Sequence, residues 1–338
     1  MGTSVAFSSH GRMPPQQKST GRDQQEQVPR CLEYALCESV AHLVQQAVAM
    51  DKETLKKKIY AKIDELPTLP VVVSKLLALL ENPEFDIGEL TELISQDPAL
   101  TAKVLKVANS AYYGFAQEVD NLDRAVALLG INMLKSLTLS VGVVAALPQK
   151  KQSDLLSHSG LWLHSVAVAA VIREMGQRMG LPKEADHLFV VGLLHDVGKI
   201  VLLHFFFDLY QETLLRTKQR EGLPLHLAER EIIGLDHGDV GAMLLGRWRF
   251  PPQVVQPIMA HHHHDLSMQA DPRDAAMLRL ANQVPQLVGL GRDGNASPPQ
   301  VRIEDLEFLG LDQAGLDGLL EFTRVSQESI QAFFDAII

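Results

Sequence analysis

The chain has 338 residues, of which 46% are hydrophobic, 21% are charged and 6% are aromatic. This length allows two ordinary domains or one large helical domain, and the composition excludes both a disulfide-stapled mini-protein and a disordered chain. The 31 Lys and Arg against 41 Asp and Glu give a formal net charge of −10. Binding to phosphates needs a basic face, so we expect no direct contact with nucleic acid.

The N-terminal part of the chain changes character near residue 31. Residues 1–30 are rich in Ser, Gln, Gly and Pro and predict a disordered leader. Residues 31–63 carry apolar side chains at helical spacing and predict an N-terminal helix. The spacing of Cys31 and Cys37 fits neither a zinc pair nor a redox CxxC motif, which favours reduced, incidental thiols. The N-terminus lacks the apolar segment of a signal peptide, and we find no run of roughly 18 apolar residues. We therefore expect a cytoplasmic protein without a membrane span.

Residues 64–148 repeat one pattern: a helix start signal, about ten amphipathic residues, and a stop. Asp86 stands three residues before Glu89 like the start of a capping box, and Asp97 puts an N-cap acceptor before Pro98. With no alternating strand pattern, this predicts a small lobe of about five helices, over 71–80, 86–95, 99–109, 121–130 and 134–147. Asp97 and Asn109 are explained as a helix cap and a helix stop, although a polar pocket beside them stays open.

Residues 149–290 predict a second, larger helical lobe, so the fold class is all-α with two lobes. The expected helices span 155–179, 182–199, 200–218, 224–234, 236–248, 252–264 and 273–288. Residues 291–338 predict a linker followed by acidic amphipathic helices, with two Arg against eight Asp and Glu after residue 300. We expect the apolar face of these helices to pack on its own chain, with a partner or a second copy as the alternative. That face consists of Leu319, Phe322, Ile330, Phe333, Phe334 and Ile337.

The most informative string runs from Gly192 to Lys199 and contains the pair His195-Asp196. At the end of an apolar helix, this pair presents an imidazole and a carboxylate, and divalent metals accept both. Helices packed side by side could aim further histidines of the same block at one interior point. Neighbours on a helix lie about 100° apart, so His263 and His264 are expected in solvent. The predicted metal ligands are His164, His195, Asp196, His237, His261 and His262.

The remaining histidines have no comparable sequence context. We therefore assign them structural or exposed positions. They are His10, His42, His158, His187, His204 and His226.

Seven segments together resemble the HDOD domain, in consistent order over roughly residues 60–285. They are Leu66–Pro70, Ser95–Leu100, Ala108–Ser110, Arg124-Ala125, Leu128–Gly130, Leu193–Lys199 and His237–Gly241. The resemblance implies a smaller N-terminal helical bundle against a lobe related to the HD phosphohydrolases. It also implies a bacterial signal-transduction module, a class in which many members have lost hydrolase chemistry.

The related HD and HD-GYP hydrolases hold metal with a first His, a His-Asp pair, further histidines and a final Asp. Residue by residue, the resemblance places His164, His195-Asp196, His237 and His261-His262 on this pattern, and Lys199 on the lysine that contacts phosphate. The chain departs from the pattern at Asn282, which stands where the final Asp belongs. The Gly-Tyr-Pro segment of the HD-GYP group is also missing.

Three functions follow from these residues. The first is a regulatory or scaffold module of the HDOD type that binds a divalent metal (Fe, Mn, Zn or Mg) with weak or no hydrolase activity. The second is an active metal-dependent phosphohydrolase or phosphodiesterase acting on a nucleotide or cyclic dinucleotide, with Asp196 and Lys199 as catalytic residues. The third is a purely structural role for the histidines in a polar core. Expected partners are signalling proteins or a small nucleotide-like ligand, and a homodimer stays open.

Overall fold

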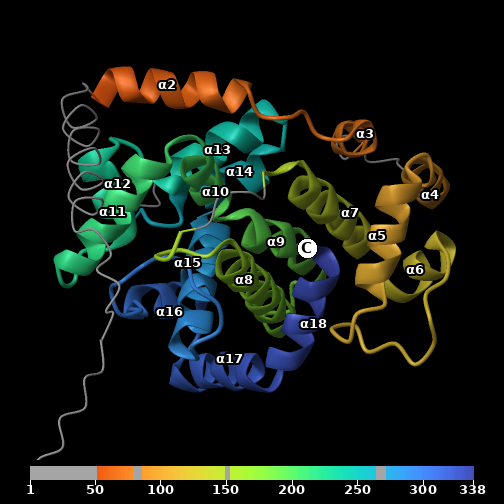
Figure 1. The fold of residues 1–338 in the computed structure, drawn as a ribbon. Helices are drawn as coiled ribbons and strands as arrows, with labels where there is room; N and C mark the ends of the chain where they lie inside the picture. The colour runs from red at the N-terminus through yellow and green to blue at the C-terminus, as the bar shows by residue number, and fades with distance from the viewer. Residues whose placement is uncertain (1–51, 80–85, 149–152, 264–271) are drawn as a thin grey trace, which may run out of the picture. The chain divides into compact units, whose positions relative to one another are not determined.

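A computed structural model describes residues 52–79, 86–148, 153–263 and 272–338, and every element of regular secondary structure within these ranges is a helix (Figure 1). The predicted all-α fold class is therefore confirmed. The helices are α2 Lys52–Asp64, α3 Val71–Leu79, α4 Ile87–Ser95, α5 Pro98–Ala108, α6 Leu122–Leu129, α7 Ile131–Ala146, α8 His158–Arg178, α9 Pro182–Leu194, α10 Val197–Phe205, α11 Phe207–Gln219, α12 Leu225–Ile232, α13 His237–Arg247, α14 Pro252–Ala260, α15 Pro272–Leu287, α16 Ile303–Leu309, α17 Gln313–Val325 and α18 Gln327–Ile337.

The start signals read from the sequence cap the helices of the first half. The carboxylate of Asp86 accepts from the backbone N–H of Glu89 at the start of α4, and that of Asp97 accepts from two backbone N–H groups at the start of α5. Asn121 caps α6 in the same way. Gly130 then separates α6 from α7 with a φ of 81°, a conformation that glycine adopts at little cost.

Two of the predicted long helices are interrupted. The expected helix over 182–199 ends at Leu194, and α10 begins at Val197, because Asp196 leaves the helical conformation (φ −101°, ψ 9°). The expected helix over 200–218 is likewise divided, between α10 and α11, at Phe206. The first break matters for function, since it places His195 and Asp196 at a junction between two helices instead of within one.

Helix α8 lies at the centre of the larger helical part and packs against α9, α15, α17 and α18. Helices α3 to α6 pack around α7, and α7 in turn contacts α9. Helices α10 and α13 cross at very short range, because Gly198 faces the backbone of His237 and a Cβ at residue 198 would lie 1.9 Å from the His237 carbonyl oxygen. This crossing fixes the start of α13 against the start of α10.

The C-terminal helices pack back on their own chain, as the amphipathic pattern predicted. Leu319, Ile330, Phe333 and Ile337 are all buried, while Phe322 and Phe334 are partly buried against the same core. The ring of Phe333 meets Phe189 of α9 edge-on, at a centroid distance of 5.5 Å. The apolar face of this acidic segment is thus covered by its own chain, by α8 and α9 and also by α5 and the loop after it.

From Lys52 onward, the described residues form one compact unit by their contacts. The predicted boundaries near residues 64, 149 and 291 stay predictions. The leader over 1–30, both cysteines and the first part of the helix over 31–63 lie outside the described residues, whereas α2 confirms that helix from Lys52 onward.

One apolar stretch, Glu184–Phe205, has the length and composition of a membrane-spanning helix, contrary to the expectation that no such run exists. The bent pair of α6 and α7 would pass the same test if counted as one span. In Glu184–Phe205, 89% of the most apolar window is buried within the fold. The physical reason for its composition is that most of the side chains of α9 and α10 are buried in the core.

Candidate metal centre

Four separate parts of the chain bring the predicted ligands to one interior point. His164 comes from the first half of α8, His195 and Asp196 from the α9–α10 junction, His237 from the first turn of α13, and His261 and His262 from the residue positions just after α14. We call these six residues the histidine cluster. The sequence predicts that these residues share one metal site. The structure brings their side chains together, and their binding of a metal stays a prediction.

Asp196 lies at the middle of the histidine cluster. One of its carboxylate oxygens, Oδ2, is 3.3 Å from Nε2 of His195 and 4.0 Å from Nε2 of His164. The other oxygen, Oδ1, is 3.3 Å from Nε2 of His237. Asp196 therefore divides the cluster into two groups of potential ligands. The Asp196 group is His164, His195 and Asp196, and the His262 group is His237, His261 and His262. Within each group the ligand atoms lie within 4.8 Å of one another.

Hydrogen bonds on the far side of three rings turn their Nε2 atoms toward the interior point. Nδ1 of His195 is 2.7 Å from the carbonyl oxygen of Gly192, and Nδ1 of His261 is 2.6 Å from that of Ile258. Nδ1 of His237 is 2.6 Å from a carboxylate oxygen of Glu229. Carbonyl and carboxylate oxygens only accept, so each Nδ1 carries the proton and a neutral ring keeps its Nε2 lone pair for a metal.

Several of the inward-facing atoms are buried without a hydrogen-bond partner among the described residues. Nε2 of His195, Nε2 of His261 and Oδ1 of Asp196 are of this kind. Leaving buried polar atoms unpaired is costly, and a bound cation removes that cost for all three. The donor set of imidazole nitrogens and one carboxylate suits zinc, iron or manganese. The residues present therefore fit a divalent metal.

Asn282 of α15 occupies the position at which the sequence pattern lacks its final acid. Its side-chain oxygen lies 2.8 Å from Nε2 of His164, and both residues are buried. A protonated Nε2 of His164 donates to this amide oxygen, so the first histidine is already partnered within the protein. An aspartate here would add a negative charge to the Asp196 group, whereas the amide adds none.

Lys199 is buried beside Asp196 and is held from two directions. Its ammonium donates to Oδ2 of Asp196 at 2.8 Å and to the backbone carbonyl of Asp293 at 3.0 Å, and the Asp293 carboxylate is 3.7 Å away. Only 1% of the surface of Lys199 and of Asp196 is exposed, and none of that of His195. The candidate centre is thus closed to solvent on this side.

The charges in this pocket set the protonation of its members. Burial by itself would raise the pKa of Asp196, but His195 and Lys199 hold it well below its usual range. Burial would lower the pKa of Lys199, and the carboxylates of Asp196 and Asp293 outweigh it and raise that pKa. The pKa of Asp293 is lowered like that of Asp196: burial would raise it, but Lys199 and His164 outweigh this effect. All three groups are consequently charged.

The histidines divide by their surroundings. Burial lowers the pKa of His164 to about 4 and puts the pKa values of His261 and His262 well below the usual range for histidine. For His237 burial acts in the same direction, but the Glu229 carboxylate outweighs it and raises the pKa. His164, His261 and His262 are therefore neutral at pH 7, which is the form that binds metals.

Three residues that the sequence did not mark belong to the surroundings of the centre. Glu229 of α12 orients His237 and also accepts from the hydroxyl of Tyr210. Asp293 reaches Lys199 from a stretch whose Gly, Asn and Pro content suggested only a linker. His226, assigned a structural or exposed position, stacks on His262 with ring centroids 4.3 Å apart and planes at 5°. For Glu229 and His226, the available sequence signal was their position shortly before a predicted ligand: Glu229 lies eight residues before His237, and His226 three before Glu229.

His263 differs from its prediction. It is half-buried instead of lying in solvent, and its Nε2 is 2.9 Å from the guanidinium of Arg230. His263 belongs to neither of the two groups of potential ligands. His264 lies outside the described residues.

A cavity of about 360 Å³ lies where a polar pocket was left open in the small lobe, lined by Asn109, Ser110 and Glu118 among others, but not by Asp97. A functional role for it stays untested, and both Asp97 and Asn109 have structural contacts. Asp97 caps α5, and the Asn109 side chain holds the loop after α5 through hydrogen bonds to the backbone of Val119.

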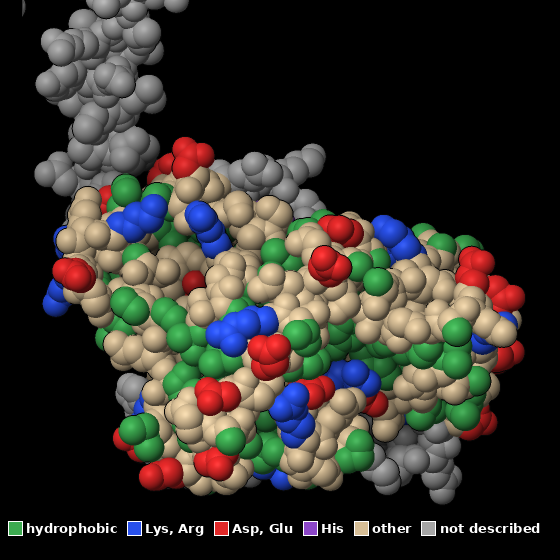
Figure 2. Space-filling model, turned by 90° about the horizontal axis from the view of Figure 1, so that it is seen from below, with side chains coloured by type: hydrophobic (Ala, Val, Ile, Leu, Met, Phe, Trp, Pro, Cys, Tyr) green, Lys and Arg blue, Asp and Glu red, His purple; other side chains and the backbone are tan. Residues whose placement is uncertain are grey.

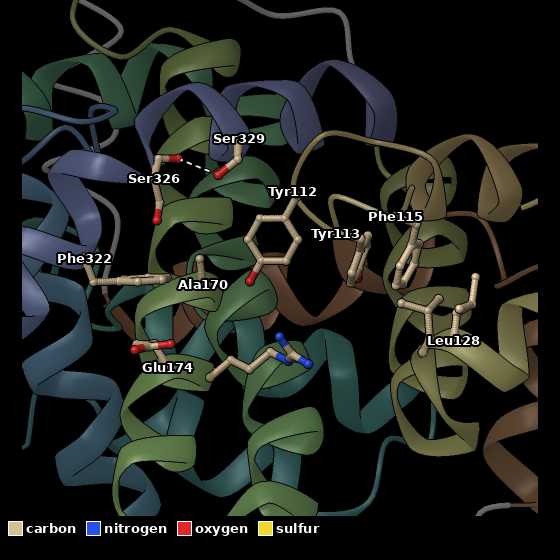
Figure 3. Close-up of a pocket in the computed structure, with 11 residues that line it drawn as sticks. Tyr112, Tyr113, Phe115, Leu128, Ala170, Glu174, Phe322, Ser326 and Ser329 are labelled. Atoms are coloured by element: carbon tan, nitrogen blue, oxygen red, sulfur yellow. Dashed lines mark hydrogen bonds between the residues drawn. The ribbon is translucent and has the colours of Figure 1, made fainter. Parts of the chain in front are cut away.

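A cavity of about 310 Å³ lies elsewhere, where the loop after α5 meets α8 and the C-terminal helices. Figure 3 shows Tyr112 pointing between Phe322 and Tyr113, with Ser326 and Ser329 above it. No member of the histidine cluster lines this cavity. The face drawn in Figure 2 likewise shows scattered charged side chains and no visible histidine, in keeping with the burial of the cluster.

Comparisons with known proteins place these features in a wider setting. The family model described as the HDOD domain matches residues 66–264. A protein of Treponema pallidum (strain Nichols) is 28% identical over 212 residues, which are 62% of this chain and 40% of that protein. The chain therefore spans well under half the length of this curated relative.

Solved structures are similar over most of the chain. One is an HDOD domain protein with unknown function from Geobacter sulfurreducens, 28% identical with a TM-score of 0.64, covering 83% of this chain and 93% of that one. Another, named "Putative phosphohydrolase" and from Shewanella amazonensis SB2B, is 27% identical with a TM-score of 0.65, covering 83% and 98%. A protein of Marinobacter aquaeolei VT8 shares the fold at 21% identity and a TM-score of 0.69, covering 86% and 67%.

Proposed function

Because the chain belongs to the HDOD domain family, we propose that it is a regulatory or scaffold module of signal transduction that binds a divalent metal at the histidine cluster and has weak or no hydrolase activity. The observation that carries this proposal is the convergence of Nε2 atoms from His195 and His237 on the carboxylate of Asp196, with the ring of His261 beside both, at centroid distances of 5.4 and 5.3 Å. Their Nδ1 atoms are all occupied by acceptors on the far side.

A divalent metal, when bound, supplies Lewis acidity toward a phosphoryl oxygen and lowers the pKa of a coordinated water. In this proposal the residues of the chain do the rest. His195, Asp196, His237 and His261 hold the cation, and His262 and His164 complete the two groups. Glu229 keeps His237 in the tautomer that binds metal, which is the usual task of a carboxylate behind a ligating histidine.

Two features favour regulation over efficient turnover. The neutral Asn282 leaves the Asp196 group one negative charge short, so two adjacent cations would be less well neutralised. Lys199, the group that a phosphate would need, is committed to Asp196 and Asp293 inside a closed pocket. The output of such a module passes through contacts with a signalling protein or through a small nucleotide-like ligand. A homodimer is compatible with either route.

The second candidate is an active metal-dependent phosphohydrolase or phosphodiesterase on a nucleotide or cyclic dinucleotide. The proximity of Lys199 to Asp196, 2.8 Å between Nζ and Oδ2, favours it, since a cation beside the metal ligands would steady a phosphate oxygen. Here Asp196 would hold the metal and Lys199 the phosphate.

Elemental analysis of anaerobically purified protein tests the shared premise of both functions. We expect at least one equivalent of Fe, Mn or Zn per chain, and loss of it in His195→Ala. Hydrolysis of nucleotides and cyclic dinucleotides, assayed with added Mn, Fe or Mg, then separates the two. Turnover that Asp196→Ala abolishes supports the enzyme, and bound metal without turnover supports the regulatory module. Protein that is free of metal in every preparation, with a thermal stability that a chelator leaves unchanged, leaves the histidines a structural role in a polar core.

A further inference from the structure

The loop over residues 290–297, between α15 and α16, closes one side of the histidine cluster. The backbone N–H of Arg292 donates to the carbonyl of Gly160 at 3.0 Å. Gly291 (φ 78°) packs so tightly on the backbone of His164 that a Cβ there would lie 2.5 Å from its nitrogen. On the other side, the side chain of Asn295 accepts from the backbone N–H of Leu225 at 3.2 Å. We call this stretch the 290–297 loop.

Asp293 is the residue of this loop that enters the interior. Its backbone carbonyl accepts from Lys199, and its carboxylate lies 3.7 Å from the same ammonium. The carboxylate is held in place by Gln286 of α15, whose amide donates to Oδ2 at 3.2 Å, and by the backbone N–H of Asn295, which donates to Oδ1 at 3.0 Å. Asp293 is therefore a positioned anion on a buried cation.

On its outer side, the same loop lines a cavity of about 330 Å³. Two exposed cations, Lys218 of α11 and Arg292, lie in its wall, together with the exposed carboxylate of Asp154. Gln286 and Asp293 line it as well, so Asp293 faces the cavity and also contacts Lys199. Displacement of the Asp293 side chain would join this cavity to Lys199 and, through it, to Asp196.

We propose that this cavity is the entry site for a phosphate-bearing ligand, and that Asp293 is a built-in competitor that occupies Lys199 until the phosphate replaces it. This rests on the proposed function, because it concerns the anion side of the same centre. The chemistry is an exchange of one anion for another on one ammonium group, with Lys218 and Arg292 drawing the ligand in. Asp293 thereby sets the phosphate concentration at which the centre opens.

The test is the binding of inorganic phosphate to the 338-residue chain, measured by calorimetry in the presence of a chelator so that no metal binds the anion. Asp293→Asn removes the competing charge and keeps the shape of the side chain. We expect its dissociation constant for phosphate to be at least tenfold lower than that of the unaltered protein. Asp208→Asn makes the same change of charge at an exposed position of α11 outside the cavity, and we expect less than a twofold effect.

Two further variants identify the cation involved. In the Asp293→Asn background, Lys199→Met should abolish the gain in phosphate affinity, and Lys218→Ala should weaken binding severalfold. Should Asp293→Asn fold poorly, as shown by circular dichroism, Gln286→Ala provides the second route. It removes the neutral donor that holds Asp293, together with its hydrogen bond to the backbone carbonyl of Asn282, and it should tighten phosphate binding by twofold to fivefold.

Equal phosphate affinity in the unaltered, Asp293→Asn and Gln286→Ala proteins would overturn the proposal, as would a gain that survives Lys199→Met. Metal content, measured in separate samples without chelator, keeps this outcome apart from the proposed function. If metal is bound but phosphate affinity is the same in all variants, the competitor role of Asp293 is wrong and the metal centre stands. If Asp293→Asn tightens phosphate binding but no metal is bound, the metal centre is wrong and the competitor role stands.

Discussion

The two groups of the histidine cluster differ in how the surrounding protein completes them. The Asp196 group lies fully inside the fold, and its members already have partners there, namely Asn282 on His164 and Lys199 on Asp196. The His262 group consists of imidazoles alone, with Glu229 behind His237, and His262 is half-buried. Within this group, Nε2 of His262 is hydrogen-bonded to Nε2 of His237 at a distance of 2.9 Å.

This difference indicates that the two groups have different affinities for a cation. A metal in the His262 group displaces only the hydrogen bond between Nε2 of His262 and Nε2 of His237, because Nε2 of His261 has no hydrogen-bond partner among the described residues. A metal that uses all of the Asp196 group must compete with a hydrogen bond at His164 and with the ammonium of Lys199. We therefore expect the first equivalent of metal to bind mainly through His237, His261, His262 and the shared carboxylate of Asp196.

The largest effect is expected from Asp196→Asn, because both groups share this carboxylate. Metal content should fall below about one tenth of that of the unaltered protein. The loss of the anion also leaves Lys199 with a weaker partner, and we expect a cost of about 3–5 kcal/mol in the free energy of unfolding. Elemental analysis and urea denaturation measure the two effects. Asp186→Asn, which removes a carboxylate paired with Arg173 outside the cluster, is the matched control and should leave the metal content unchanged.

Glu229→Gln should weaken metal binding by about 10–100-fold, because the amide no longer fixes the protonated Nδ1 of His237 as strongly. Competition with a chelator of known affinity measures this change. Tyr210→Phe is its control, since it removes the one hydrogen bond of Glu229 that does not involve His237 and should cost only about 1 kcal/mol of stability with little loss of metal. Equal effects of the two variants would mean that Glu229 serves the fold and not the His262 group.

Acid should destabilise the metal-free protein through its neutral histidines. The pKa of His164 is lowered to about 4 and those of His261 and His262 are also lowered, so between about pH 6.5 and 4 the unfolded chain binds protons that the folded chain does not. Stability contributed by these groups is present above pH 6.5 and falls as the pH drops through this window.

His237 acts in the opposite direction, because its raised pKa adds stability below pH 6.5 that is lost at higher pH. Three groups outweigh one, and the net slope should be on the order of 1 kcal/mol per pH unit. Urea denaturation at several pH values in chelator gives this slope. His164→Gln should flatten it, and a flat profile in the unaltered protein would contradict the assigned shifts.

Asn282→Asp adds the missing negative charge to the Asp196 group. It tests whether the lack of this charge lowers the metal affinity of the Asp196 group relative to the His262 group. We expect about tenfold tighter binding of the metal held by His164 and Asp196, worth about 1.4 kcal/mol. The metal-free variant should be less stable than the unaltered protein, because a buried carboxylate then lies near Asp196. Unchanged metal affinity would show that geometry, and not charge, limits this group.

The smallest effect is expected at His226, whose ring stacks on His262 from outside the cluster. His226→Ala removes the stacking on His262 and should lower stability by about 0.5–1 kcal/mol, with a small loss of metal affinity. His226→Phe keeps a flat ring at this position and should restore both. If His226→Phe loses metal as strongly as His226→Ala, the imidazole of His226 has a direct role at the centre.

The comparison also shows what the sequence could predict. Asp86, Asp97 and Asn121 carry local signals, and the helices that they cap begin where expected. The six members of the histidine cluster were found because His195-Asp196 drew attention to other histidines in apolar surroundings. The pair was placed near the end of an apolar helix, but the predicted end at residue 199 was too late, since the apolar run continues without Pro past Asp196, where the helix breaks.

Asp293 and Glu229 were missed for a different physical reason. Their roles depend on tertiary contacts, with Lys199 94 positions away in the chain for Asp293 and with the ring of His237 for Glu229. A glycine-rich stretch and an acid in an amphipathic helix are ordinary in sequence. Only the packing of the 290–297 loop against α8 and α10 distinguishes Asp293 from the other aspartates of the chain.

The short contact between Gly198 and the carbonyl of His237 has a consequence for protein engineering. The backbones of α10 and α13 touch there, so the distance between Asp196 and His237 is set by main-chain atoms and not by adjustable side chains. Introducing a single methyl group at position 198 would push the two helices apart and widen the space between carboxylate and imidazole. Attempts to retune the centre for a larger or smaller ion would therefore begin at this glycine, before any ligand is exchanged.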